Sequence, residues 1–190
     1  GDDRSFSVFS IALHEGDGNM PYFDKLEVGE AAMDHTIRKI KQSEIPLLSD
    51  FLYEAIFVPE GVAPPPREII DRPELQVYTS AFGERDSDIC YVAEVNGRVV
   101  GAVWVRVMDD YGHIDDETPS FAISLYREYR SQGMGTALMK AMLDELKERG
   151  YRQASLAVQK ANGALNMYKK LGFEIVDEKD EEYIMLRHLC

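Results

Sequence analysis

The sequence predicts a single α/β domain built on one mixed, mostly antiparallel sheet that carries helices on both faces. The first supporting observation is an Asn-Gly pair at 96–97 between two strand-like runs, 89–95 and 98–108, a strong signal for a β-hairpin. The second is a strand, a helix and a strand in succession, at 121–126, 134–149 and 154–158. Such a unit requires a parallel strand pair joined by a right-handed crossover, so the sheet combines both strand directions.

One strand and two helices are expected before the hairpin. The strand spans 35–41, and Ser43 can cap the helix that follows it. The buried stripe of this helix consists of Ile45, Leu48, Leu52, Ala55 and Ile56. Prolines and a glycine interrupt the chain over 58–66 and exclude a regular element there. A short helix is then expected at 73–81, with Pro73 in its first turn.

A loop, a long helix and a last hairpin are also expected after residue 108. Residues 109–119 form a polar, acidic loop that leads into the strand 121–126. The helix 134–149 ends at Gly150, a residue suited to the left-handed conformation of a helix C-cap. A last hairpin is expected over 174–189.

Composition excludes several classes of function. The formal net charge of −13 argues against nucleic-acid and anionic-membrane binding, because both need a basic surface. The sequence has no apolar run of membrane-spanning length and no charged-then-apolar leader. With only two cysteines, Cys90 and Cys190, it favours a reducing cytoplasm over a disulfide framework. Its four histidines are scattered without metal-ligand spacing, so no metal is expected.

The length of 190 residues fits one domain with an ample core. We expect residues 1–32 to form an N-terminal extension and residues 33–190 to form the domain. The extension carries no motif of its own. We expect it to pack on the domain or on a neighbouring subunit, which leaves a homodimer open.

Gly133 and Gly135 lie in the turn between the strand 121–126 and the helix 134–149. The first amides of a helix have no internal acceptor and lie at the positive end of its dipole, and glycine lets a phosphate approach them. A nucleotide P-loop does not fit, and Leu138 stands where a dinucleotide fingerprint needs its third glycine. The alternative interpretation is a tight turn that needs glycine for packing.

The pattern Arg130-x-x-Gly133-x-Gly135 at this turn resembles the pyrophosphate-binding signature of the GNAT superfamily of acyl-CoA-dependent N-acetyltransferases. The resemblance implies that backbone amides of 132–136 anchor the pyrophosphate of acetyl-CoA. It also implies that the two parallel strands splay apart and that the pantetheine arm fills the gap between them.

A second motif resembles the same family. The run Asn162-Gly-Ala-Leu-Asn-Met-Tyr168, followed by Gly172-Phe173, is similar to the later motif in which an Asn precedes a short helix that carries a Tyr. It implies that Asn162 contacts the cofactor arm and that Tyr168 is the general acid. The alternatives are that Asn162 caps the helix and that Tyr168 packs in the core beside Phe173. The resemblance runs from about residue 36 to the C-terminus.

The resemblance implies a set of cofactor-binding residues. They are Ile123, Ser124, Leu125, Arg130, Ser131, Gln132, Gly133, Met134, Gly135, Thr136 and Asn162. A backbone N–H near Leu125 is expected to hydrogen-bond the thioester oxygen as charge develops there. Further donors to the anionic cofactor are expected among the nearby basic residues, Arg127, Arg130, Lys160, Lys169 and Lys170.

The expected activity is transfer of an acetyl group from acetyl-CoA to a primary amine by direct attack in a ternary complex. The acceptor is a small amine or a peptide amino group. The resemblance implies that the loop 57–68 borders the acceptor, and the alternative is that this loop is a rigid surface connection. The loop 109–119 is also expected to border the acceptor. The amine must lose a proton, and Glu94, Glu117 and Glu128 are candidate bases that the sequence does not rank. Two alternatives are an acyl-CoA-binding sensor or regulatory domain without turnover, and a protein-interaction domain that keeps only the fold.

Overall fold

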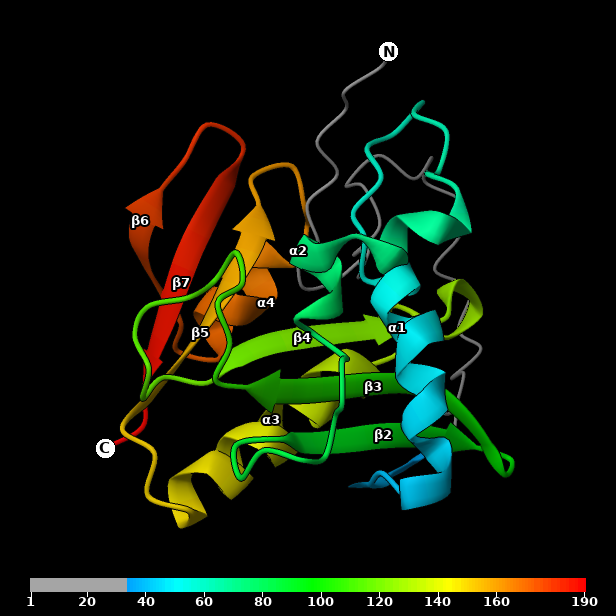
Figure 1. The fold of residues 1–190 in the computed structure, drawn as a ribbon, viewed down its shortest axis with the longest axis horizontal. Helices are drawn as coiled ribbons and strands as arrows, with labels where there is room; N and C mark the ends of the chain where they lie inside the picture. Colours follow the sequence, from blue (N-terminus) through cyan, green and yellow to red (C-terminus); the bar gives the residue numbers. More distant parts are fainter. Residues whose placement is uncertain (1–33) are drawn as a thin grey trace, which may run out of the picture.

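The computed structural model describes residues 34–190, so the predicted extension over 1–32 lies outside the described residues and stays a prediction. A seven-stranded sheet with the strand order β1-β2-β3-β4-β5-β7-β6 forms the centre of the molecule (Figure 1). Its strands are β1 (Thr36–Lys39), β2 (Ile89–Val95), β3 (Arg98–Arg106), β4 (Ser120–Leu125), β5 (Gln153–Gln159), β6 (Glu174–Glu178) and β7 (Glu182–His188). Strands β4 and β5 are parallel and the other neighbouring pairs are antiparallel, which confirms the predicted mixed sheet.

Helices cover both faces of this sheet, as predicted. They are α1 (Leu48–Glu54), α2 (Pro73–Gln76), α3 (Met134–Glu148) and α4 (Leu165–Lys170), with 3-10 turns η1 (Gln42–Leu47), η2 (Arg67–Asp71) and η3 (Arg127–Tyr129). Helices α1 and α2 pack on the face that carries Ala102, Trp104 and Ala122. Helices α3 and α4 pack on the other face, with Val103 and Phe121. Side chains alternate between faces along a strand, so β3 and β4 serve both cores at once.

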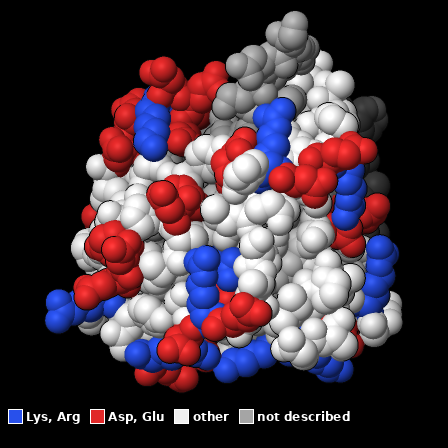
Figure 2. Space-filling view, viewed as in Figure 1, with Lys and Arg blue, Asp and Glu red and all other residues white. Residues whose placement is uncertain are grey.

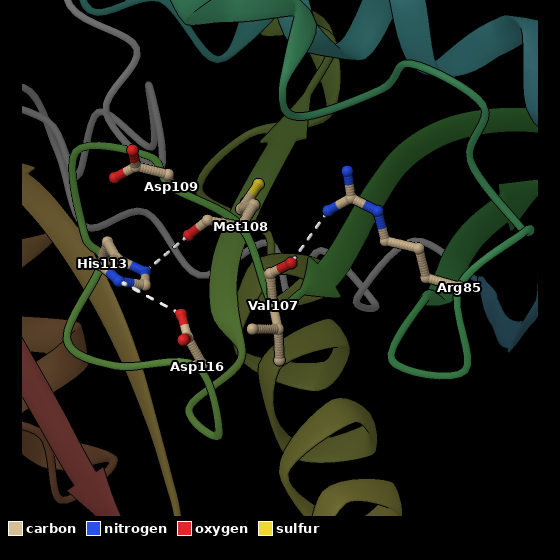
Figure 3. Close-up of a pocket in the computed structure, with 6 residues that line it drawn as sticks. All are labelled: Arg85, Val107, Met108, Asp109, His113 and Asp116. Atoms are coloured by element: carbon tan, nitrogen blue, oxygen red, sulfur yellow. Dashed lines mark hydrogen bonds and ion pairs between the residues drawn. The ribbon is translucent and has the colours of Figure 1, made fainter.

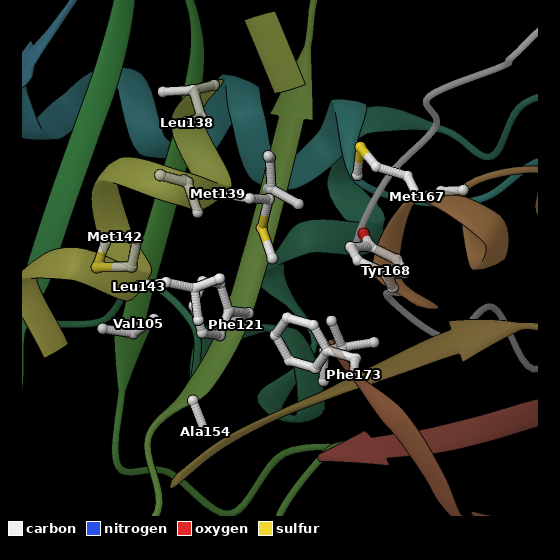
Figure 4. Packing of buried hydrophobic residues seen from close by; sticks show 14 of the residues in the cluster. Val105, Phe121, Leu138, Met139, Met142, Leu143, Ala154, Met167, Tyr168 and Phe173 are labelled. Atoms are coloured by element: carbon white, nitrogen blue, oxygen red, sulfur yellow. The ribbon is translucent and has the colours of Figure 1, made fainter. Parts of the chain in front are cut away.

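Helix α3 begins at Met134 as predicted and ends at Glu148, one residue before the predicted end, because its apolar residues recur at helical spacing. Its buried side chains include Leu138, Met139, Met142, Leu143 and Leu146. Figure 4 shows the first four of these facing the strands that carry Val105 and Phe121. Burying each such side chain stabilises the fold by about 1.5–3 kcal/mol. Gly150 follows the helix at φ +84°, which confirms the predicted C-cap.

The predicted cap at Ser43 is wrong. Pro46 lies inside the segment, which forms the 3-10 turn η1, and the α-helix begins only at Leu48. At the start of η1, the Glu44 carboxylate accepts the backbone N–H of Lys41 at 2.8 Å and also pairs with Arg38. A carboxylate one residue further along therefore does the capping that we expected of the Ser43 hydroxyl.

The helix predicted over 73–81 begins at Pro73 but ends at Gln76. Beyond it, the carbonyl oxygens of Val77 and Ser80 accept hydrogen bonds from the buried Arg106 guanidinium at 3.0 and 2.9 Å. These carbonyls therefore accept bonds from a residue distant in sequence. The chain continues as turns over 77–83, in which Ala81 has φ +52°.

Strands β4 and β5 are paired only where both begin. Their register contains one residue pair, Ser120 with Ser155, and the Ser155 N–H donates to the Pro119 carbonyl at 3.0 Å. Among the described residues no further pair joins them, although β4 continues to Leu125 and β5 to Gln159. The two strands therefore diverge, as the predicted splay requires.

Candidate active site

The glycine loop that connects β4 to α3 presents backbone amides at the start of the helix. The first bond within the helix runs from the Ala137 N–H to the Gly133 carbonyl at 3.1 Å. The amides of 133–136 precede that bond, so they have no acceptor within the helix. Gly133 has φ +84°, and a Cβ added there would meet nothing within 4 Å. The loop thus needs glycine for its backbone conformation, and the space in front of it is open.

Arg130 fastens this loop to the sheet and to α1. Its Nε donates to the Leu125 carbonyl at 3.0 Å, and its Nη2 lies 3.3 Å from the Glu54 carboxylate. The side chain is 11% exposed. Burial lowers the pKa of Arg130 and raises the pKa of Glu54, although each is partly compensated by the other's charge. In this arrangement the guanidinium positions the loop, and its direct contact with a cofactor stays a prediction.

The edge of β4 that faces the gap carries two amides. The Tyr126 N–H donates to the carbonyl of Val100, near the start of β3, at 2.9 Å. Backbone groups alternate in direction along a strand, so the amides of Ile123 and Leu125 point away from β3, toward the gap. Ser124 has the opposite orientation: its backbone faces β3 and its hydroxyl donates to the Phe51 carbonyl at 2.6 Å. The structure therefore brings Ile123 and Leu125 to the gap, but not Ser124.

Asn162 and Tyr168 lie on the opposite side of the gap, at helix α4. The buried Asn162 Oδ1 accepts the Ala164 N–H at 3.0 Å at the start of the helix. Tyr168 is fully buried, and its ring packs edge-on to Phe173 at 5.9 Å between centroids (Figure 4). Phe173 in turn packs edge-on to Phe121 of β4 at 5.8 Å. Both residues thus have the structural contacts named as alternatives, and their roles toward a cofactor stay predictions.

Two buried carboxylates that the sequence analysis missed lie near the start of the gap. Asp110 Oδ2 accepts the Ser120 hydroxyl at 2.6 Å, while its Oδ1 is buried without a hydrogen-bond partner. Glu182 Oε2 is also buried without one. Among the side-chain atoms of residues 34–190, these two are the buried oxygens or nitrogens that lack a partner. Burial raises the pKa of Asp110 to about 6 and raises that of Glu182 as well.

This pair is hard to recognise from the sequence, because Asp110 stands in a run of polar residues that is typical of a solvated loop. The structure buries it through Gly112, whose carbonyl accepts the Ser155 hydroxyl at 2.7 Å. A Cβ on Gly112 would lie 2.8 Å from the Ser120 hydroxyl and 3.0 Å from the Ala157 nitrogen. A glycine two residues after an aspartate was the one available signal that this loop packs closely on the sheet.

The model of the acetyltransferase (GNAT) family matches residues 52–173. The chain belongs to the GNAT family. It is 33% identical over 111 residues to an N-alpha-acetyltransferase of Sulfurisphaera tokodaii, covering 54% of this chain and 61% of that protein. It is 35% identical over 94 residues to an acetyltransferase of Pectobacterium atrosepticum, covering 48% and 62%. The chain therefore spans about three fifths of the length of these curated relatives.

Solved GNAT structures confirm the fold. The PaiA N-acetyltransferase of Thermoplasma acidophilum, solved in complex with coenzyme A, superimposes with a TM-score of 0.58 at 18% identity. The match covers 82% of this chain and 99% of that one. The predicted family and the predicted fold class are both confirmed.

The other charged residues named from the sequence are spread around the GNAT domain. Glu94 lies on β2, where it accepts the Arg38 Nε at 2.6 Å, and β3 separates it from the gap. Glu117 and Glu128 are exposed. Lys160 pairs with Glu178 at 2.5 Å. The remaining basic residues of that set, Arg127, Lys169 and Lys170, are exposed.

A polar pocket of about 330 Å³ lies at the other end of the sheet from the glycine loop (Figure 3). It is lined by Arg85, Val107, Met108, Asp109, His113 and Asp116. In the register of β3 and β4, Arg106 pairs with Ser120, whereas Gly101 pairs with Leu125, next to the glycine loop. The pocket is therefore not part of the predicted cofactor site.

No group of three or more His, Cys, Asp or Glu side chains among residues 34–190 could hold a metal ion. Within the same range, no helix has the length and apolar content to cross a membrane.

Proposed function

We propose that this chain is an acetyl-CoA-dependent N-acetyltransferase that transfers the acetyl group to a primary amine by direct attack in a ternary complex. The observation that supports the proposal is that, in this GNAT chain, the amides of the glycine loop and the gap-facing amides of β4 follow one another along the chain. The open amides of 133–136 and the gap-facing amides of Ile123 and Leu125 belong to one segment, so a single extended ligand can contact both.

The chain's own groups fit acetyl-CoA. The amides at the start of α3, with the partial positive charge of the helix dipole, would hold the pyrophosphate. The edge of β4 would hold the pantetheine arm, with Asn162 across the gap. When bound, acetyl-CoA supplies the activated acetyl group. One gap-facing amide of β4, near Leu125 or at Ile123, would donate to the acyl oxygen as it gains negative charge, a stabilisation worth about 3–4 kcal/mol for such a donor.

Tyr168 is the proposed general acid, which protonates the sulfur as the thioester bond breaks. It lies on the helix that follows β5, across the gap from β4, and its burial keeps bulk water from competing for the sulfur. A positioned general acid typically contributes about 10²–10⁴-fold to the rate. A thiol with a pKa near 8.5 is already a fair leaving group, so we expect the lower end of this range.

The acceptor is proposed to be a small amine or a peptide amino group. The N-alpha-acetyltransferase of Sulfurisphaera tokodaii supports an amine acceptor by its name, and the acidic surface of this chain suits a cation. A cytoplasmic location and a homodimer stay predictions.

The proposal is tested by thiol release from acetyl-CoA with four acceptor classes: polyamines, amino acids, peptide N-termini and aminoglycoside antibiotics. We expect release with at least one amine class and, by mass spectrometry, an acetylated product. Binding of acetyl-CoA without release in any class would support a sensor instead. Release confined to alcohol acceptors would contradict N-acetyl transfer.

A further inference from the structure

We propose that Asp110 and Glu182 form the acceptor site, where they receive the ammonium group of a cationic primary amine and Asp110 accepts the proton that the amine must lose. The inference rests on the proposed function, since it names the acceptor's site in the same reaction. It is based on two carboxylates that each have a buried oxygen without a hydrogen-bond partner, beside the opening of the β4–β5 gap.

Asp110 has several neutral donors around its carboxylate. Its Oδ2 accepts the Ser120 hydroxyl at 2.6 Å. The hydroxyl of the fully buried Tyr78 and the backbone N–H groups of Gly112 and of Asp110 itself also hydrogen-bond the carboxylate. Its Oδ1 has no partner. A buried carboxylate oxygen without a donor costs free energy unless a ligand supplies one, and an ammonium group supplies up to three.

The position of Asp110 connects it to the gap. Ser120, which it binds, is the residue at which β4 and β5 are last paired. The adjacent Gly112 packs on β5 beside the Ala157 nitrogen. The gap-facing amide of Ile123 lies three residues further along β4, or about 10 Å at the rise of a strand. A bound amine, with one water where needed, spans that interval between the carboxylate and the acyl group.

Glu182 lies on β7, on the sheet face that carries Ala157 and Ile184. It pairs with Gln159 of β5, two positions along from the pair Ala157 with Ile184, so its side chain shares their face of the sheet. Ala157, Ile184 and Phe57 form a small apolar cluster against which Tyr111 packs. These side chains would contact the carbon chain of the amine, while the carboxylates contact its charged end.

The electrostatics of the pair favour a cation. Burial raises the pKa of both groups, and the negative charge of Asp110 raises that of Glu182 further. Lys179 lies 3.8 Å from Glu182 Oε1 and compensates only in part. The other titratable groups facing this site from neighbouring elements are Tyr78, Tyr111, Glu74 and Arg72. A ligand cation between the two carboxylates removes the repulsion between them.

The β6–β7 hairpin extends this negative field to the surface. Figure 2 shows acidic side chains gathered over the hairpin, at the upper left of the view. They come from the run 174–182, which contains six acidic residues and one lysine. Because Glu182 begins β7, this surface adjoins the acceptor site and would concentrate a cationic acceptor near it.

The proton balance of the step is complete. The ammonium gives one proton to Asp110 Oδ1, which passes it to solvent, and its nitrogen then forms the bond to the acyl carbon as the carbon–sulfur bond breaks. The nitrogen loses a second proton in forming the amide. That proton replaces the one that Tyr168 gives to the sulfur.

The test uses the full chain, acetyl-CoA, and 2-phenylethylamine and n-butylamine as probe amines, with thiol release measured from pH 5 to 9. Asp110→Asn should lower kcat/KM by roughly 10²-fold and abolish the acid limb of the pH profile. Glu182→Gln should raise KM for the amine about tenfold with a smaller effect on kcat. Asp109→Asn and Glu181→Gln, exposed neighbours with the same loss of charge, should behave like the parent.

A further variant keeps the test valid if Asp110→Asn does not fold. The Ser120 hydroxyl lowers the pKa of Asp110, so Ser120→Ala should move the acid limb to higher pH. An unmoved limb, or an Asp110→Asn variant with the parent's rate and profile, would overturn the acceptor site while leaving the proposed function intact. A parent chain that binds acetyl-CoA in calorimetry but releases no thiol with any amine would overturn the proposed function, and the acceptor site with it.

Discussion

Asp88 and Asp110 are both buried carboxylates near the end of β3, but the fold satisfies only one of them. Asp88 accepts Nε and Nη2 of Arg106, both at 2.9 Å, and the Gly83 N–H at 2.8 Å. Neither side chain of this ion pair is exposed. Asp110 has neutral partners and one oxygen with none. The first is a closed structural network, whereas the second keeps a binding capacity that the fold itself does not use.

The same contrast distinguishes the two edges of β4. Toward β3 the strand is paired along its whole length, and toward β5 it is paired at one residue only. The fully paired edge fixes the strand, and the open edge carries the amides that we assign to the cofactor. The amides of β4 that have no neighbouring strand to pair with thus lie along the edge that faces β5.

The largest expected effect tests the closed network. Asp88→Asn leaves the buried Arg106 guanidinium without a counter-charge, and we expect a loss of about 3–5 kcal/mol in the free energy of unfolding. Urea denaturation measures this, with the exposed neighbour Asp86→Asn as a control. A loss below 1 kcal/mol would mean that the ion pair is not the structural network described above.

Asp110→Asn should have the opposite sign at neutral pH. Burial raises the pKa of Asp110 from 3.8 to about 6, so the folded state binds this proton more tightly than the unfolded state. Its contribution to stability is therefore present below pH 4 and is lost as the pH rises through 6. Relative to Asp110→Asn, the parent should lose about 3 kcal/mol between pH 4 and pH 7. Parallel unfolding curves at all pH values would contradict this.

Tyr168 is a third buried polar group. A variant of it tests whether its hydroxyl has a structural role, like Asp88, or acts on a ligand, as proposed for Asp110. Tyr168→Phe removes the hydroxyl and keeps the ring that packs on Phe173. We expect kcat to fall roughly 10²-fold with little change in acetyl-CoA affinity. Tyr151→Phe, which packs against the same core, is the matched control. If Tyr168→Phe turns over at the parent's rate, the residue is structural.

The smallest expected effect concerns residues 1–32. The groups assigned to the cofactor all lie in 123–168, so a chain that begins at Met33 should bind acetyl-CoA with the parent's affinity. Circular dichroism establishes that the shortened chain is folded before calorimetry is done. A folded chain that has lost binding would place the extension in the site.

Much of this fold could be predicted because the signals are local. The Asn96-Gly97 turn adopts positive φ at both residues, as a tight hairpin between β2 and β3 requires. The spacing of apolar residues defined α3, and the glycines defined its start. The family motifs also identified the divergence of β4 and β5, which no local pattern indicates.

The buried ion pairs and the proposed acceptor site could not be predicted, because they join residues distant in sequence. Arg106 meets Asp88 across 18 positions, and Arg130 meets Glu54 across 76. Asp110 and Glu182 come together only through the packing of a loop and a hairpin on one sheet face. A sequence shows that such residues are charged, but not which of them the fold leaves without a partner.

The most direct test of the cofactor site compares two glycines of α3. Gly133 and Gly150 share φ +84° and have no atom within 4 Å of an added Cβ, so valine imposes the same backbone strain at either end of the helix. Only Gly133 lies at the amides assigned to the pyrophosphate. In calorimetry with acetyl-CoA, Gly133→Val should lose at least about tenfold in affinity, or 1.4 kcal/mol, while Gly150→Val keeps the parent's value. Equal affinities in the two folded variants would contradict the assignment.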